Sequence, residues 1–353
     1  MPLRSGIIIP AVPYQPIINS AFNIWQDGAS FPSIASGVWM ADNWIYGKSG
    51  VGVQDALRST TVPTVAQAQR TNYSLHLDVI TADASIAAGD YYTLATRIEG
   101  YFFAPFDQKE WSFRFWVQGA KVGRHYVYAR NSGADRSCVI GYDIAVADVY
   151  QEFQVTFPAN PSAGTWDYTN GRGLEIGWCL AAGSTYHTTA GAWQTGNFKS
   201  ASDQVNEMDS TANNFRIGLI GPPTLGSYAA PFAPVPIDLD EFRCKRYLEV
   251  WGGSANSVFA TGWISTATSA DFSLPMVLKR ATSPTVSVAT IGNTGIIGSF
   301  GVYAASGAPA FLTSGARDPF LRITSAGMGA DIGKACGYYS GTTEQLKIAS
   351  RIP

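Results

Sequence analysis

The segment Trp111-Ser112-Phe113-Arg114-Phe115-Trp116-Val117 decides the fold class of this chain. Successive side chains of a β-strand point to opposite faces, so the odd positions, which hold Trp, Phe, Phe and Val, share one apolar face. Arg114 and Trp116 share the other face. The apolar face predicts a core between two packed sheets. The outward Trp116 predicts either a binding platform or a subunit contact.

The same period of two, interrupted by Gly, Asn, Ser and Pro, recurs along most of the chain. It predicts strands at residues 74–79, 91–99, 111–118, 125–130, 137–143, 152–157, 174–180, 215–220 and 237–247. Helical periodicity is almost absent. This rhythm of short strands is typical of a two-sheet antiparallel jelly roll in an all-β protein.

Length and composition predict more than one domain. The chain has 353 residues, of which 46% are hydrophobic and 13% aromatic, enough for sizeable cores. After Tyr247 the sequence becomes richer in Gly, Ala, Ser and Thr, and strands are expected near residues 259–264 and 285–290. We therefore expect an extended arm at residues 1–16, a jelly roll at 17–249 and a smaller β domain at 250–353. Pro10, Pro13 and Pro16 favour the arm, because proline lacks the backbone donor that a sheet uses.

The scarcity of charge predicts subunit association. Only 14% of the residues are charged, against about 25% in typical soluble domains. The net charge of −2 gives no field that would attract nucleic acid, and no run of about 18 apolar residues predicts membrane insertion. The second domain has more apolar residues than about one hundred residues can bury alone, namely Ile296, Ile297, Phe300, Val302, Tyr303, Phe311 and Leu312. This favours a homotrimer, with the C-terminal domain and its apolar loop Ala304 to Leu312 contributing to the contact.

Several motifs, spaced over nearly the whole chain, carry a family resemblance. Residues 18–46 read INSAFNIWQDGASFPSIASGVWMADNWIY, and the later motifs are RIEG at 97–100, GAWQTGNFKSASDQVNEMDSTANNF at 191–215, AAPF at 229–232 and CKRY at 244–247. The pattern resembles the carbohydrate-binding-module-like jelly-roll domain of bacteriophage tail and virion proteins. Asn23 and Asp27 depart from it, since the family has an acidic residue and an arginine there.

The resemblance implies a structural virion protein, which would be assembled in the host bacterial cytoplasm. It would be a short fibre, spike or tail-associated appendage that contacts host surface polysaccharide and docks on other virion proteins through its N-terminal arm. Phage fibres commonly have three-fold symmetry, which also favours a trimer. The alternative is a capsid or tail decoration protein that acts only through virion contacts. No coiled-coil heptad or repeat indicates a long fibre.

The sequence offers no catalytic motif, and we expect no enzyme. Asp167, Asp203, Glu207 and Asp209 lie in expected loops near aromatic residues, so a glycan-degrading depolymerase remains a weaker alternative. The four cysteines, Cys138, Cys179, Cys244 and Cys336, have no metal-binding spacing and are expected to be free, mostly buried thiols.

The segment Gly164 to Arg172, GTWDYTNGR, is the first candidate for glycan binding. Aromatic rings stack on the apolar faces of sugars, and amide, carboxylate and guanidinium groups bind their hydroxyls. The candidates are Trp166, Asp167, Tyr168, Asn170 and Arg172, followed by Tyr186, His187 and Trp193. The alternative is that these rings only close the ends of the core.

The resemblance also implies one structural Ca²⁺. Carbohydrate-binding jelly rolls often hold this ion between the first strand and an acidic pair in the last, and Ca²⁺ takes oxygen ligands. The candidate ligands are Asn19, Asn23, Asp238 and Asp240, with the acidic pair in the strand expected at 237–247.

Overall fold

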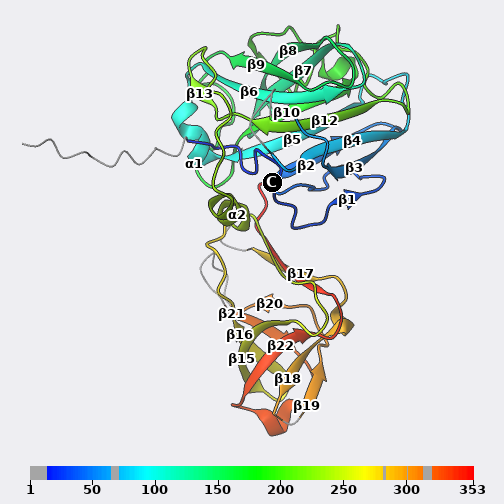
Figure 1. The fold of residues 1–353 in the computed structure, drawn as a ribbon. Coiled ribbons are helices and arrows are strands. Elements are labelled where there is room, and N and C mark those ends of the chain that lie inside the picture. Colours follow the sequence, from blue (N-terminus) through cyan, green and yellow to red (C-terminus); the bar gives the residue numbers. More distant parts are fainter. Residues whose placement is uncertain (1–13, 65–70, 281–283, 300, 313–319) are drawn as a thin grey trace, which may run out of the picture. The chain divides into compact units, whose positions relative to one another are not determined.

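The computed structural model describes residues 14–64, 71–280, 284–299, 301–312 and 320–353 (Figure 1). Residues 1–13 of the expected arm and Phe300 lie outside this range. Tyr14 and Gln15, at the end of that arm, pack on the domain that follows. The Tyr14 hydroxyl donates to the Phe102 carbonyl at 2.7 Å, and Gln15 Nε2 donates to the Ile220 carbonyl at 3.0 Å.

The chain forms two compact units. The first contains residues up to Asn23 and then Ala29–Asp240, and the second contains Ile24–Gly28 and Glu241–Pro353. The short piece Ile24–Gly28 is held in the second unit by its polar side chains. Gln26 Nε2 donates to the Leu248 carbonyl at 2.8 Å, and Lys347 Nζ donates to an Asp27 carboxylate oxygen at 2.8 Å. A motif near the N-terminus therefore belongs to the unit built from the C-terminal part of the chain.

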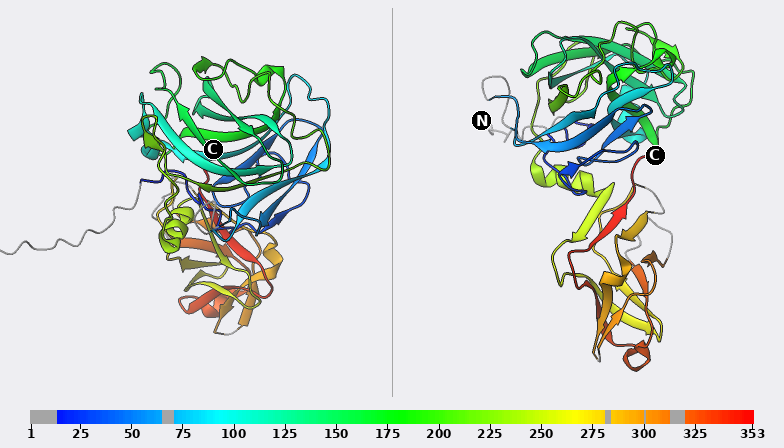
Figure 2. Two further views of the ribbon diagram at one scale, coloured as in Figure 1. Left: turned by 45° about the horizontal axis from the view of Figure 1, so that its top comes forward. Right: turned by 90° about the vertical axis from the view of Figure 1, so that its right-hand side faces the viewer.

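The first unit is a sandwich of two antiparallel sheets (Figures 1 and 2). One sheet contains β1 (Ser30–Phe31), β3 (Val53–Ser59), β4 (Ser74–Thr81), β12 (Asn214–Ile220), β6 (Trp111–Gly119) and β13 (Thr224–Leu225), with β9 (Gln151–Phe157) also paired to β6. The other has the order β11 (Trp193–Thr195), β8 (Arg136–Ile144), β7 (Gly123–Asn131), β10 (Arg172–Ala182), β5 (Tyr91–Glu99) and β2 (Trp44–Lys48). Short helical turns lie between strands at α1 (Gly100–Phe103), η1 (Ala104–Phe106) and η2 (Ser184–Tyr186).

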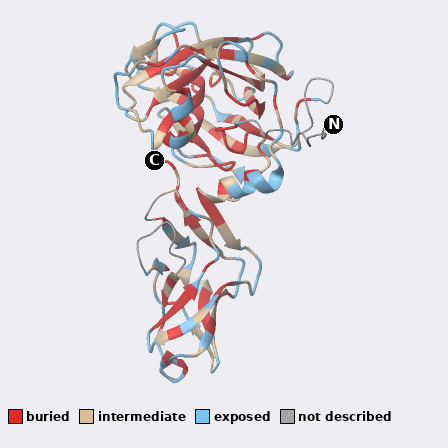
Figure 3. Cartoon of the chain, turned by 90° about the vertical axis from the view of Figure 1, so that its left-hand side faces the viewer, coloured by how far each residue is buried: buried red, intermediate tan, exposed pale blue. Residues whose placement is uncertain are grey.

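The core lies between these sheets, as the alternation in β6 predicts. Trp111, Phe113, Phe115 and Val117 are all buried, whereas Arg114 and Trp116 are half-buried. Aromatic rings join the two layers, because Phe115 of one sheet lies 5.4 Å from Trp178 of the other, measured between ring centroids. Figure 3 shows the buried residues concentrated in these strands. The predicted two-sheet fold is confirmed.

All but the last of the nine predicted strands are present in this unit. The last prediction is wrong: residues Ile237–Lys245 form a helix, α2, which is largely exposed (Figure 3). Its sequence IDLDEFRCK has acidic residues in the first turn and basic residues in the last, an order that favours a helix through its dipole. The charge order was readable in the sequence, although the apolar spacing suggested a strand.

The second unit contains two antiparallel sheets. The smaller has the order β14 (Leu248–Gly252), β23 (Gln345–Ala349) and β17 (Thr285–Val288). The larger has the order β19 (Gly301–Ala304), β18 (Thr294–Gly298), β22 (Ala335–Ser340), β15 (Val258–Thr266), β16 (Ser269–Ser273), β21 (Phe320–Thr324) and β20 (Ala310–Phe311), with turns at η3 (Ile291–Asn293) and η4 (Met328–Asp331). The strands expected near 259–264 and 285–290 correspond to β15 and β17.

The apolar residues of the second unit divide into two groups. Ile296 is buried in the unit's own core, and Tyr303 and Phe311 pack against that core. Ile297 and Val302, which pair across β18 and β19, are 40% and 59% exposed. Only some of the apolar side chains noted in the sequence are therefore exposed and able to contact another subunit.

The four cysteines are free and buried, which confirms the prediction for them. Within the described residues, no helix is long and apolar enough to cross a membrane.

Candidate functional site

Three neighbouring strands bring opposite charges together on one face of the six-stranded sheet. Glu175 of β10 lies directly opposite Arg97 of β5 on one side and Arg130 of β7 on the other. The neighbours of Glu175 along β10, Leu174 and Ile176, are buried in the core, so these three charged side chains point away from it. The register of the sheet therefore places one carboxylate between two guanidinium groups on the outer face.

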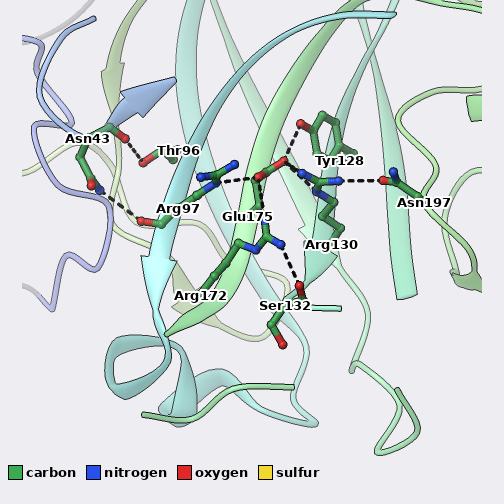
Figure 4. A network of polar contacts seen from close by, with 9 residues as sticks. All are labelled: Asn43, Thr96, Arg97, Tyr128, Arg130, Ser132, Arg172, Glu175 and Asn197. Atoms are coloured by element: carbon green, nitrogen blue, oxygen red, sulfur yellow. Dashed lines mark hydrogen bonds and ion pairs between the residues drawn. The ribbon is translucent and has the colours of Figure 1, made fainter. Parts of the chain in front are cut away.

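Glu175 is the centre of a network of charge-assisted hydrogen bonds (Figure 4). Its carboxylate accepts from Arg97 Nε at 3.0 Å, from Arg130 Nε at 2.8 Å and from Arg172 Nη1 at 3.3 Å. The Tyr128 hydroxyl donates to it at 3.0 Å. Burial alone would raise the pKa of Glu175, but Arg130 and Arg97, with a smaller effect of Lys199, outweigh burial and hold this pKa well below its usual range. Glu175 is therefore ionised at neutral pH.

A glycine gives Tyr128 its position in this network. A Cβ at Gly177, the residue of β10 opposite Tyr128, would lie 2.3 Å from the Tyr128 ring. The missing side chain lets the ring lie across β10, where its hydroxyl reaches Glu175. The ring also forms part of the surroundings of Lys199.

Lys199 lies among three aromatic rings. Its Nζ is 4.6 Å from the ring centroid of Tyr91, 4.8 Å from that of Tyr128 and 5.5 Å from that of Tyr186. The backbone supports this arrangement, because Lys199 N–H donates to the Tyr186 carbonyl at 2.9 Å. Lys199 is buried, and within the described part of the chain its ammonium has no hydrogen bond or ion pair. Burial, followed by the nearby Arg130, lowers the pKa of Lys199 to about 8.

These groups line a pocket that we call the outer-face pocket. Its volume is about 110 Å³, and its lining includes Tyr91, Thr93, Arg97, Tyr128, Arg130, Glu175 and Lys199, together with Ser36, Gly37 and Gly47. Tyr91 lies edge-on to the Tyr186 ring, with 5.0 Å between ring centroids. The pocket thus combines aromatic rings with fixed donors, a combination suited to a small polar ligand.

The predicted aromatic candidates separate into two places. Trp166, Tyr168 and Trp193 lie near Phe103 of α1. The Trp166 ring stacks on Phe103, with 5.5 Å between ring centroids, and packs edge-on against Trp193, also with 5.5 Å between centroids. Tyr168 stacks on Phe103 at 6.3 Å, and its hydroxyl donates to Asp107 at 2.9 Å. Tyr186 instead belongs to the rings around Lys199. We call Phe103, Trp166, Tyr168 and Trp193 the tryptophan cluster.

The polar candidates are divided in the same way. Arg172 joins the Glu175 network and also donates from Nη2 to the Ser132 carbonyl at 2.8 Å. Asp167 accepts from the backbone N–H of Thr169 at 2.7 Å and so stabilises its own turn. The His187 Nε2 lies 2.8 Å from the Ala182 carbonyl, and Asn170 is half-buried. The loop 164–172 therefore contributes one residue, Arg172, to the outer-face network.

The acidic residues of the hydrolytic alternative have separate surroundings. Asp203 accepts from the Tyr126 hydroxyl at 2.5 Å, and Asp209 pairs with Lys121. Glu207 is fully buried, and burial raises its pKa well above the usual value. A carboxyl group held neutral in a core is poorly placed to meet a substrate.

Helix α2 contains two of the candidate calcium ligands, Asp238 and Asp240, and turns them in different directions. In a strand, Asp238 and Asp240 would share a face, but two residues apart on a helix they point about 200° apart. Asp240 is buried and accepts from the backbone N–H of Asn19 at 3.3 Å, whereas Asp238 is exposed. Asn23 Oδ1 is buried with no hydrogen-bond partner among the described residues. One buried carboxylate falls short of the six to eight oxygens that Ca²⁺ takes, and the ion stays a prediction.

Sequence reasoning missed Arg97, Arg130, Glu175 and Lys199, because strand pairing brings the first three together and the loop after β11 adds Lys199. One signal was present: Tyr126, Tyr128 and Arg130 alternate in His125–Arg130, so all three share a face of β7. That pattern could have indicated an outer face with aromatic and basic character.

Comparison with known proteins gives similarity in structure only. No family model and no curated protein sequence matches the chain. The structure is similar to a tailspike protein 4 domain of bacteriophage CBA120, with 15% identity over 55% of this chain and 21% of that one, at a TM-score of 0.29. A family 11 carbohydrate-binding module from Clostridium thermocellum matches with 10% identity over 57% of this chain and 97% of the module, at a TM-score of 0.30. A putative sugar-binding protein from Bacteroides thetaiotaomicron matches with 10% identity over 60% of this chain and 100% of that protein, at a TM-score of 0.37.

Proposed function

We propose that the first unit is a glycan-binding module of a short virion appendage, and that sugars bind in the outer-face pocket. The observation that carries the proposal is the pocket itself, where the half-buried Tyr91 ring lies beside the fixed donors of the Glu175 network and the Tyr186 ring packs edge-on against Tyr91. Aromatic rings stack on sugar C–H faces, and guanidinium, hydroxyl and ammonium groups bind sugar hydroxyls.

The network makes the pocket rigid. Every arginine around Glu175 is fixed by at least one further contact: Arg130 donates to Asn197 Oδ1 at 2.9 Å, Arg172 donates to Ser132, and the Arg97 guanidinium lies 5.5 Å from the Trp39 ring centroid. A pocket arranged in advance loses little side-chain entropy when a ligand binds. This rigidity supports a role in binding.

The virion part of the proposal rests on the motifs at residues 18–46, 97–100, 191–215, 229–232 and 244–247. Attachment to other virion proteins through the N-terminal arm and a trimeric state belong to this proposal. A decoration protein that acts only through virion contacts is the alternative, and it would have no use for an open polar pocket.

Binding of the whole chain to a panel of bacterial surface polysaccharides, measured by affinity electrophoresis, tests the proposal. We expect retardation by at least one polysaccharide, a loss of about fivefold or more in affinity with Tyr186→Ala, and little change with Tyr168→Ala. The reverse order of the two variants would move the site to the tryptophan cluster. No retardation by any polysaccharide would favour the decoration protein, and release of new reducing ends would favour the depolymerase.

A further inference from the structure

We infer that the outer-face pocket takes an acidic glycan, one whose sugar carries a carboxylate or phosphate group, and that Lys199 contacts this anionic group. The inference rests on the proposed glycan binding and adds the chemical class of the ligand. It follows from the charges that surround the pocket and from the contacts that Lys199 lacks.

The charges around the pocket do not balance. Of the charged residues that line the pocket, three are cations, Arg97, Arg130 and Lys199, and one is a carboxylate, Glu175, so positive charges outnumber negative ones there. The whole chain has a net charge of −2, so this excess is local. In the second unit, by contrast, Arg322 pairs with its own carboxylate, Asp271, at 2.7 Å. A pocket lined by more positive than negative groups attracts anions.

Several nitrogens of Arg130 and Arg172 already have partners in the protein. Arg130 directs Nε and Nη2 to Glu175 and Nη1 to Asn197, and Arg172 directs Nη1 to Glu175 and Nη2 to Ser132. Their main contribution to an incoming ligand is therefore the positive potential. A pocket-lining group whose donors all lack a protein partner is better placed for a direct contact.

Lys199 is that group. An ammonium has three donors, and within the described residues none of those on Lys199 meets an acceptor. Burying an unpaired charge is unfavourable, and the three rings around Lys199 offset only part of that cost. An anionic ligand would supply the missing acceptor and at the same time reduce the excess charge. The ammonium lines the pocket at the side where Tyr91 and Tyr186 meet.

The same geometry predicts how binding depends on pH. The groups that act on Lys199 are Tyr91 of β5, Tyr128 and Arg130 of β7, Arg172, Glu175 and Cys179 of β10, and Tyr186 of η2. Burial raises the pKa values of Tyr128, Tyr186 and Cys179, and the pKa of Glu175 is low, so none of these four changes charge near pH 8. Lys199 has a pKa of about 8 and loses its charge between pH 7 and pH 9. Affinity for an anion should therefore fall about tenfold over this interval, while affinity for a neutral sugar should not.

Isothermal titration of the full chain with three probes tests the inference: a neutral oligosaccharide, an oligouronate and a phosphorylated oligosaccharide of similar length. We expect one of the two acidic probes to bind at least tenfold more tightly than the neutral one, and the identity of that probe distinguishes carboxylate from phosphate. Lys199→Met should reduce this preference to about twofold or less. The matched control is Lys109→Met, since Lys109 is exposed and its ammonium donates to the Pro105 carbonyl at 3.0 Å, away from the pocket lining; it should leave the preference unchanged.

The outcomes separate the inference from the proposed function. Equal binding of neutral and acidic probes would overturn the inference and leave glycan binding in place, whereas no binding of any probe would remove both. If Lys199→Met fails to fold, the wild-type pH profile decides: a preference for the acidic probe that stays constant from pH 7 to pH 9 would overturn the role of Lys199.

Discussion

Replacing Glu175 by glutamine tests whether its carboxylate holds the outer face of the sheet together. Glutamine keeps the shape of the side chain but removes the negative charge between Arg97 and Arg130. Breaking a buried ion pair by removing one partner costs about 3–5 kcal/mol, because the remaining charge stays buried without compensation. The side chain of Glu175 is 3% exposed, and those of the three arginines are 14–17% exposed and can partly regain water. We therefore expect a loss of about 3 kcal/mol, the lower end of that range.

Thermal unfolding followed by near-ultraviolet circular dichroism measures this loss, because Trp44, Trp111 and Trp178 are buried in the first unit. A loss of about 3 kcal/mol corresponds to a decrease of roughly 6–12 °C in Tm for a domain of this size. The matched control is Glu152→Gln, since Glu152 pairs with Arg114 at 3.4 Å and both side chains are about a third exposed. Surface pairs contribute about 0–1 kcal/mol, so the control should lower Tm by less than about 4 °C.

The pH dependence of the difference between wild type and Glu175→Gln gives a second measurement. The pKa of Glu175 is lowered on folding from an ordinary value of 4.5. A carboxylate with a lowered pKa stabilises the folded state above its unfolded pKa, and this contribution is lost as the pH falls toward the folded pKa. The difference in Tm should therefore stay constant from pH 7 to pH 5 and decrease below about pH 4.5. A Tm for Glu175→Gln within about 2 °C of wild type at pH 7 would refute the role given to the network.

Three further predictions concern packing and assembly. Gly177→Ala should cost about 1–3 kcal/mol by displacing the Tyr128 ring, whereas Gly218→Ala, whose new Cβ would meet Pro63 at 3.5 Å, should be nearly neutral in urea unfolding. Trp166→Ala should lower the free energy of unfolding by about 2 kcal/mol, less than for a fully buried tryptophan, because its half-buried ring stacks on Phe103. The control is Tyr228→Ala, since Tyr228 is 65% exposed. A Tm unchanged by Trp166→Ala would instead indicate that this ring is a free binding platform. If the protein is a homotrimer that uses the exposed pair Ile297 and Val302, Val302→Asp should give monomers in sedimentation velocity, and a folded wild-type monomer at micromolar concentration would contradict the trimer.

The alternation of side chains determined much of the fold from the sequence. In residues 111–117 four large apolar side chains occur at every second position, and burying them requires a second sheet opposite, which the rings of Phe115 and Trp178 provide. The free, buried state of the cysteines could also be predicted from their spacing. The helix at Ile237–Lys245 could not be recognised from apolar spacing, because its apolar residues Ile237, Leu239 and Phe242 are exposed and do not share one helix face. Only the order of its charges indicated a helix.

The outer-face pocket depended on tertiary structure. Residues 97, 130, 175 and 199 are far apart in the chain, and local periodicity assigns each side chain to a face without saying which strands become neighbours. The sheet order β7-β10-β5 and its register put Arg97, Glu175 and Arg130 side by side, and the loop after β11 adds Lys199. A shift of one residue in that register would turn Glu175 into the core and Leu174 outward. The sequence thus determined which side chains could face outward, and strand pairing decided which of them meet, because charges interact strongly only when the fold brings them within a few ångströms.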